Sequence, residues 1–142
     1  MSSQTLPLEI SPEEYQPVKP LDPEEDARIQ QRLKDAGNLP RHIAVIMDGD
    51  RRWADEHNRP RTDGHRFGRE SVRDIVRACG HLEIEVLTLY TFSTENWSRP
   101  AIEVKALMQW LHESLRDEVP ELDDNNVRLN AIGRTDELPK TV

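Results

Sequence analysis

The stretch HIAVIMDGD, residues 42–50, decides the fold class, because it joins a short apolar run to an acidic turn. A run of this length that ends in turn residues is typical of a buried β-strand. Two further runs have the same character, VLTLYTF at residues 86–92 and VRLNAI at residues 127–132. We therefore predict three strands in this chain.

Helical patterns fill the segments between these strands. We predict a short helix around residues 52–57, a longer helix that begins near Gly64, and another from about residue 100 to 118. The order strand, helix, strand, helix, strand predicts an α/β fold, in which a parallel β-sheet is flanked by helices and joined by right-handed crossovers. Helical spacing of apolar residues marks one face of the second helix (Val72, Ile75, Val76, Cys79) and of the third (Val104, Leu107, Met108, Leu111, Leu115).

The N-terminal part of the chain has a different composition. Residues 1–21 contain four prolines with acidic residues between them, and we predict a disordered acidic arm there. Asp22 and Pro23 then form a helix-start signal, and Gly37 forms a stop signal. We interpret residues 22–39 as a surface helix and a linker.

The composition of the 142 residues excludes several functional classes. The formal net charge of −8 argues against a general nucleic-acid binder, which needs excess cations to displace phosphate counterions. The single cysteine excludes an intrachain disulfide framework. No apolar run reaches the length of a transmembrane helix, and the N-terminus lacks the features of a signal peptide. We expect a cytoplasmic protein.

The basic residues are concentrated in one region. Residues 41–78 contain nine basic residues, all of them arginine, against seven acids, whereas the flanking regions are acidic. A local cationic region suits a small polyanion, and the planar fork of arginine binds phosphate through two hydrogen bonds. We interpret the three arginines with i, i+4 spacing (Arg69, Arg73, Arg77) as a solvated helix face. We assign anion binding instead to Arg51, Arg52 and Arg61.

A polar motif follows each predicted strand. MDGDRR follows the first strand, FSTENWSRP follows the second, and IGRT follows the third. In parallel α/β sheets, ligands bind beyond the carboxyl ends of the strands. The sequence therefore predicts a functional site at the edge of the sheet where these three motifs meet.

Asp48 is the candidate metal ligand of this site. It ends the first strand and precedes Gly49, where the backbone can come close to a ligand. The start of the following helix offers free N–H groups for an anion. Mg²⁺ prefers one or two carboxylates together with phosphate oxygens, which fits a carboxylate beside an arginine cluster. The alternative is that Asp48 acts only as a helix cap.

Three segments resemble the cis-prenyltransferase family, which includes undecaprenyl diphosphate synthases and isoprenyl transferases. They are HIAVIMDGDRRWA (42–54), GHRFG (64–68) and LTLYTFSTENWSRPAIEVKALM (87–108), and the resemblance spans about residues 40–135. In that family an allylic diphosphate such as farnesyl diphosphate ionises with the help of Mg²⁺. Isopentenyl diphosphate then adds repeatedly with cis geometry to make a polyprenyl carrier lipid. The resemblance implies these two diphosphates as substrates and Mg²⁺ as the cofactor.

The resemblance also implies roles for individual residues. The implied catalytic residues are Asp48, Asp50, Ser93, Glu95 and Asn96, with Asp48 as the Mg²⁺ ligand. The implied substrate-binding residues are Gly49, Arg51, Arg52, Trp53, Arg61, His65, Trp97 and Arg99. The hydrocarbon tail needs an apolar channel, and the candidate walls are the sheet face and the stripe of Leu107, Met108 and Leu111. Plain core packing is the alternative for that stripe.

The chain departs from the family pattern at two positions and in length. Asp50 stands where the family has asparagine, and its added negative charge is expected to weaken diphosphate binding. Glu83 stands where the family has glycine. Family chains continue well past residue 142, so residues 40–142 are predicted to be the N-terminal portion of the family's domain, and the fold is expected to be truncated. The resemblance implies a homodimer whose interface is incomplete here, and a lipid product that brings the protein to a membrane surface.

Two alternative functions stay open. The first is a non-catalytic, truncated relative or partner module that keeps the fold without turnover. The second is a haloacid dehalogenase-like phosphatase, because AVIMDGD matches an apolar strand followed by the Asp-x-Asp pair of that family. Polyprenyl synthesis from labelled isopentenyl diphosphate, or phosphate release from a phosphomonoester, separates these hypotheses.

Overall fold

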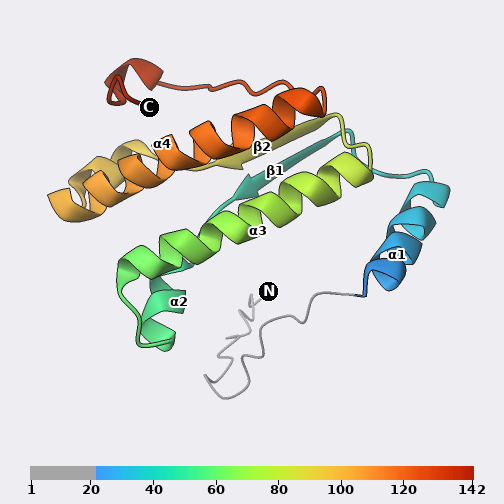
Figure 1. Ribbon diagram of the computed structural model, residues 1–142, viewed down its shortest axis with the longest axis horizontal. Helices are drawn as coiled ribbons and strands as arrows, with labels where there is room; N and C mark the ends of the chain where they lie inside the picture. Colours follow the sequence, from blue (N-terminus) through green and yellow to red (C-terminus); the bar gives the residue numbers. More distant parts are fainter. Residues whose placement is uncertain (1–21) are drawn as a thin grey trace, which may run out of the picture. The chain divides into compact units, whose positions relative to one another are not determined.

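The computed structural model describes residues 22–142 of the chain (Figure 1). The predicted disordered arm at residues 1–21 lies outside the described residues. The described residues divide into two units, of which the first ends at Pro40 and the second spans residues 41–142. Within residues 22–142, no helix is both long enough and apolar enough to span a membrane.

The first unit contains helix α1, which spans Pro23–Asp35 and confirms the predicted helix. Asp22 caps its N-terminus, because Oδ1 of this residue accepts a hydrogen bond from the backbone N–H of Glu24 at 3.0 Å. Pro23 suits the first helical position, where an N–H group would have no partner. Gly37 follows the helix with a φ of 68°, a left-handed conformation that glycine adopts without strain.

The second unit is built on strands β1 (His42–Ile46) and β2 (Val86–Tyr90), which pair in parallel along their whole length. This confirms the first two predicted strands and the α/β class. Exposure alternates along β1, since Ile43 and Val45 are half-buried whereas Ile46 is 79% exposed. The prediction of a fully buried strand is therefore wrong, because the alternation shows only one face of the strand to be covered.

Along the sequence, β1 is followed by helices α2 (Asp50–Glu56) and α3 (Arg61–His81), and then by β2. Helix α3 begins three residues earlier than predicted, with Pro60 in the position that precedes the first helical turn. Proline suits this position because it lacks the N–H group that would otherwise stay unpaired. Arg61, which we expected in a loop, therefore lies on the first turn of α3.

Gly64 and Gly68 allow the close packing of α3 against α2. In the structure a Cβ atom on Gly64 would lie 2.2 Å from the backbone oxygen of Asp50. The glycines therefore allow α2 to contact α3 closely, and Ala54 of α2 is fully buried.

After β2 the chain forms the 3₁₀ turn η1 (Thr94–Ser98), helix α4 (Ala101–Asp124) and a final 3₁₀ turn, η2 (Thr135–Glu137). Helix α4 extends beyond the predicted end at residue 118 and continues through Pro120. Leu107 and Met108 of its predicted apolar stripe are buried. The apolar face that the sequence indicated is therefore the face that enters the core.

Helices α3 and α4 lie side by side (Figure 1). A row of ion pairs connects them. Three arginines of α3 pair with acids 44 to 49 residues later, so the two helices run in the same direction. The pairs are Arg69 with Asp117 (2.9 Å) and Glu118 (3.1 Å), Arg73 with Glu118 (2.6 Å), and Arg77 with Glu121 (3.5 Å). The prediction of a solvated face is wrong for Arg69 and Arg73, because α4 presents acids that partly bury them, whereas Arg77 is exposed as predicted.

The third predicted strand does not form, although its alternating apolar sequence favours an extended backbone. Residues 127–132 have no regular secondary structure and make no backbone hydrogen bonds with β1 or β2. A strand requires a partner to satisfy its N–H and C=O groups, and local sequence does not supply one. Val127, Leu129 and Ile132 are accordingly exposed.

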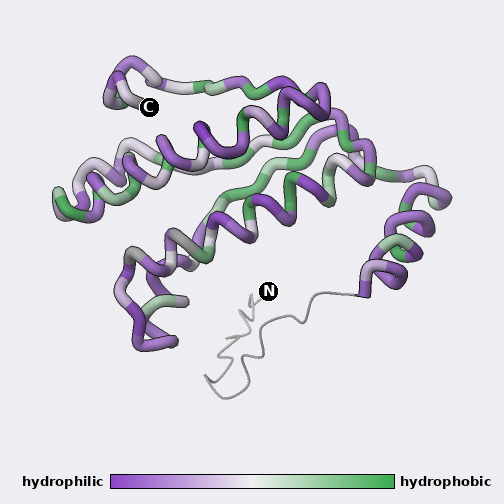
Figure 2. Tube along the Cα trace, in the orientation of Figure 1, coloured by the Kyte–Doolittle hydropathy of each residue, from purple (hydrophilic) through white to green (hydrophobic). Residues whose placement is uncertain are grey.

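The core of the second unit is thin. Figure 2 shows hydrophobic residues along both strands and mainly hydrophilic residues along much of the helices. The buried apolar side chains of the described residues are Ala54, Cys79, Leu107 and Met108. Burial raises the pKa of the Cys79 thiol, which keeps this side chain a small apolar core residue.

Candidate functional site

A pocket of about 310 Å³ opens where β1 ends. Its lining residues come from both strands and from helices α2, α3 and α4, so it lies at the carboxyl edge that the sequence indicated. Asp48, Asp50 and Ser71 supply its polar groups. Its apolar wall includes Val45, Met47, Val72, Ile75, Leu89 and Trp110. An apolar cavity with a few convergent polar groups is typical of a small-molecule site.

The wall of this pocket agrees with the predicted channel at the sheet, where Val45 and Leu89 line it, but not at the predicted stripe of α4. Helix α4 contributes Trp110 to the lining, whereas Leu107 and Met108 are buried in the core and line no part of it. The sequence argument did not single out Trp110, although it lies three residues after Leu107 and so shares its side of the helix. The Trp110 indole Nε1 is buried and has no hydrogen-bond partner, so one donor remains available there.

Asp48 is placed where the sequence predicted, directly after β1, and its side chain is 80% exposed. Its Oδ1 accepts a hydrogen bond from the backbone N–H of Gly49 at 2.7 Å, and its Oδ2 lies 3.6 Å from Arg52. Gly49 has a φ of 109°, a conformation that L-residues rarely adopt, so this turn requires glycine. Asp48 therefore keeps lone pairs directed to solvent at the pocket.

These features fit a magnesium ion that is shared with a ligand. Within residues 22–142, no three His, Cys, Asp or Glu side chains gather into a metal cluster. Mg²⁺ does not need such a cluster, because it is usually held by one or two carboxylates together with substrate phosphate oxygens and water. Asp48 is the carboxylate of this chain that would hold it.

Asp50 and His65 form a pair between α2 and α3. Oδ2 of Asp50 lies 2.9 Å from Nδ1 of His65, and the His65 side chain is only 14% exposed. Because His65 lies on α3 and Asp50 lines the pocket, the pair joins two residues that the sequence assigned separately to the site. The partnership itself was not predicted.

One of the predicted arginines pairs with a carboxylate that the sequence argument missed. Arg61 forms an ion pair of 2.8 Å with Glu103, whose side chain is 19% exposed. The hydrogen bond from Arg61 lowers the pKa of Glu103, and the charges of Arg99 and Arg51 act in the same direction. An acid in the first turn of a helix is ordinarily explained by the helix dipole, so its sequence position did not suggest this role.

Trp53 does not line the pocket. Its ring stacks on His57 with centroids 4.3 Å apart and packs against Phe67 at 4.5 Å. Arg59 covers the Phe67 ring from 5.4 Å. The side chain therefore holds α2 against α3, which positions Asp48 and Asp50 indirectly.

The loop FSTENWSRP forms the turn η1, and its polar side chains bond mainly to one another. Oδ1 of Asn96 accepts from the backbone N–H of Ser93 at 2.8 Å, and the Ser98 hydroxyl donates to the Glu95 carbonyl at 2.6 Å. The hydrogen bond with Ser93 lowers the pKa of Glu95. Trp97 packs edge-on against Phe92 with centroids 5.0 Å apart. Within residues 22–142, these bonds shape the loop and do not connect it to Asp48.

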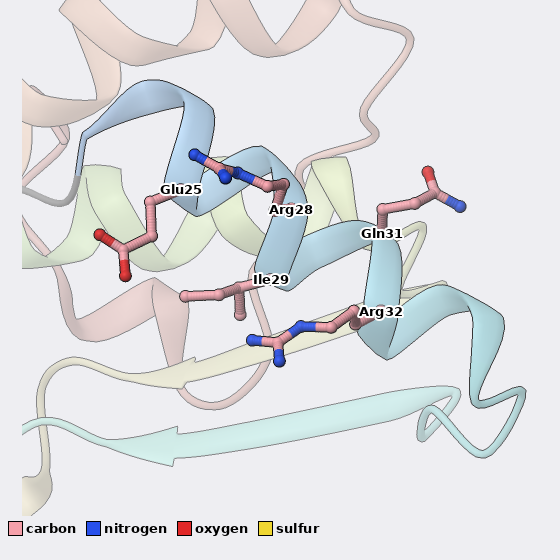
Figure 3. Close-up of a pocket in the computed structure, with 5 residues that line it drawn as sticks. All are labelled: Glu25, Arg28, Ile29, Gln31 and Arg32. Atoms are coloured by element: carbon pink, nitrogen blue, oxygen red, sulfur yellow. The ribbon is translucent and has the colours of Figure 1, made fainter.

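A larger hollow lies along α1, but it carries no comparable chemistry. Figure 3 shows its lining side chains, all of which come from this one helix: Glu25, Arg28, Ile29, Gln31 and Arg32. A single helix cannot enclose a ligand, and Arg28 is engaged with the backbone oxygen of Glu24 at 3.1 Å. The pocket at the end of β1 is therefore the better candidate site.

Comparison with known families shows which proteins this chain is similar to. A family model described as "Putative undecaprenyl diphosphate synthase" matches residues 46–142. An isoprenyl transferase of Clostridium tetani is 54% identical over 106 residues, which is 75% of this chain and 42% of that protein. An isoprenyl transferase of Chlorobaculum tepidum is 51% identical over 118 residues, which is 83% of this chain and 44% of that protein. The chain thus spans less than half the length of these relatives.

A solved structure has the same arrangement of elements. The crystal structure of lavandulyl diphosphate synthase from Lavandula x intermedia, in complex with dimethylallyl diphosphate, superposes with a TM-score of 0.69 at 33% sequence identity. The match covers 72% of this chain and 44% of that chain. The fold expected from the sequence is therefore confirmed for the part that both chains share.

Proposed function

Because this chain belongs to the undecaprenyl diphosphate synthase family, we propose that the pocket at the end of β1 binds an allylic diphosphate for prenyl transfer. The proposal is based on one observation, a pocket that is lined by the carboxylates of Asp48 and Asp50 and by an apolar wall. Its carboxylates suit a metal ion that would carry the diphosphate, and its apolar wall suits the hydrocarbon tail. Family membership also sets aside the phosphatase alternative.

The basic residues would hold the diphosphate. Arg61 pairs with Glu103 at 2.8 Å, and the charges of Arg51 and Arg99 also lower the pKa of that carboxyl, which supports a shared basic region. Guanidinium groups bind phosphate oxygens strongly, and they stabilise the negative charge that develops on them when the diphosphate leaves. Mg²⁺ held by Asp48 would supply further stabilisation of that charge.

The proposal extends to the family's complete reaction. We propose that isopentenyl diphosphate is condensed onto the allylic diphosphate with cis geometry, in the synthesis of a polyprenyl carrier lipid. Ser93, Glu95, Asn96 and Arg99 would shape the loop over the second substrate. We propose that the protein is a cytoplasmic homodimer. Its lipid product would bring it to a membrane surface.

Equilibrium binding tests the proposal on the chain itself. We expect the full chain to bind dimethylallyl diphosphate and farnesyl diphosphate in a Mg²⁺-dependent manner, measured by titration calorimetry. Asp48→Asn and Arg61→Ala should each weaken binding about tenfold or more, because each removes a charged partner of the diphosphate. Arg77→Ala is the matched control, since Arg77 lies on the same helix and pairs with Glu121 at 3.5 Å. Equal losses in all three variants would contradict the assignment.

A further inference from the structure

The side chain of Asp50 is confined by helix α3. Its Oδ2 lies 2.9 Å from Nδ1 of His65. A Cβ atom on Gly68 would lie 2.8 Å from Oδ1 of Asp50, and one on Gly64 would lie 2.2 Å from its backbone oxygen. Gly64 and Gly68 lie one turn apart on α3, and Asp50 packs against both of them. A side chain at either position would clash with Asp50.

The bond between Asp50 and His65 has only one polarity when the carboxylate is ionised. A carboxylate only accepts hydrogen bonds, so Nδ1 of His65 must carry the proton and donate it. An asparagine at this position, as in the family that the sequence resembles, could either accept from Nδ1 or donate to it. Asp50 thus restricts His65 more tightly than the amide would.

The burial of the two side chains makes this restriction effective. His65 is 14% exposed, so its ring has little room to turn, whereas Asp50 is 42% exposed and lines the pocket. Among the described side chains of residues 22–142, Asp50 is the hydrogen-bond partner of the His65 ring, and the bond is made through Nδ1. Nε2 is consequently the ring nitrogen that remains for a ligand.

We propose that Asp50 is a positioning residue, which acts through His65 by holding Nδ1 protonated and leaving Nε2 to meet the diphosphate. The ligand in this statement rests on the proposed function, but the state of the ring does not. Asp50 also places a negative charge beside the diphosphate, so the carboxylate orients His65 at a cost to affinity. The two effects separate experimentally, because Asp50→Asn removes the charge and retains an acceptor, while Asp50→Ala removes both.

The state of the ring is measured by ¹⁵N NMR of the imidazole nitrogens in the full chain, at a pH where the ring is neutral. We expect Nδ1 of His65 to be protonated in the wild type, whereas in Asp50→Asn, whose amide can accept from Nδ1 or donate to it, we expect both tautomers. In Asp50→Ala the proton should move toward Nε2, the position preferred by free imidazole side chains. Gly68→Ala should have the same effect while keeping the charge, since its Cβ displaces the carboxylate. Glu56→Gln, at the exposed end of α2, is the control and should change nothing.

Binding of inorganic pyrophosphate with Mg²⁺ tests the consequence. We expect Asp50→Asn to bind more tightly than the wild type, and Asp50→Ala to bind about fivefold more weakly than Asp50→Asn, the effect of one hydrogen bond. In a His65→Ala background the Asn and Ala variants should bind equally. A difference that persists without His65, or a wild-type ring protonated on Nε2, overturns the proposal. If no variant binds pyrophosphate but the NMR result holds, the proposed function fails and the positioning of His65 stands.

Discussion

Glu83 has a strained backbone conformation. It precedes β2 with a φ of 59°, in the left-handed region that side chains with a Cβ disfavour. The family that the sequence resembles has glycine at this position, and the backbone conformation supplies the physical reason. Asn58 and Asn126 adopt similar φ values, 50° and 57°, but asparagine tolerates this region better.

We expect Glu83→Gly to raise the free energy of unfolding by about 0.5 to 1 kcal/mol. The relief of left-handed strain, about 1–2 kcal/mol, exceeds the extra entropy of glycine in the unfolded chain. Chemical denaturation followed by circular dichroism measures the change. Asn126→Gly is the control and should gain less, because asparagine bears less strain. A loss of stability in Glu83→Gly would show that other contacts of the Glu83 side chain outweigh the backbone term.

Helix α3 contains glycines with opposite roles, and these roles depend on the neighbouring element. Gly64 lies against α2, where a Cβ would come within 2.2 Å of a backbone oxygen, whereas a Cβ on Gly80 would meet nothing within 4 Å. In an isolated helix both positions would favour alanine over glycine by about 1 kcal/mol. Packing therefore reverses the preference at one position and leaves it unchanged at the other.

Gly64→Ala should lower the free energy of unfolding by about 2 kcal/mol, because α2 must move away from α3 and backbone cannot yield cheaply. Gly80→Ala should raise it by up to about 1 kcal/mol through helix propensity alone. Thermal and chemical unfolding of the two variants provide the comparison within one helix. Equal effects of the two substitutions would contradict the close contact between α2 and α3.

The second unit as a whole depends on carboxylates that are ionised in its ion pairs. Hydrogen bonds from Arg61 lower the pKa of Glu103, and those from Arg69 and Arg116 lower the pKa of Asp117. A carboxyl whose pKa is lower in the folded state stabilises the fold above its unfolded pKa. This contribution is lost as the pH falls through the folded value, which lies below the ordinary range near 4.

We therefore expect the free energy of unfolding to decrease as the pH is lowered from about 5 to about 3. In the double variant Glu103→Gln, Asp117→Asn the decrease should be smaller, because two of the groups that take up protons on unfolding are gone. Denaturation curves at a series of pH values measure both chains. Glu56→Gln serves as the control for a lost surface carboxylate and should leave the slope unchanged. A double variant with the wild-type slope would contradict the role of these ion pairs.

Local patterns carried the prediction of most elements and of the main site. The apolar runs at residues 42–46 and 86–90 form the two paired strands, and Asp48 lies at the pocket where β1 ends. These features follow from periodicity, turn residues and the general geometry of parallel sheets, all of which are read along the chain. The prediction of a strand at residues 127–132 is wrong. An alternating pattern predicts an extended backbone, but it cannot supply a partner strand.

The sequence by itself determined the α/β class, the acidic turn at Asp48 and Gly49, and the arginine-rich region suited to a diphosphate. Only the tertiary structure decided that Glu103 faces Arg61, that Trp110 lines the pocket and that Asp50 holds His65. The partners in the two ion pairs are 42 and 15 residues apart in the chain. Such pairs depend on how helices pack against one another, and helical periodicity shows which face is buried without showing what it will meet.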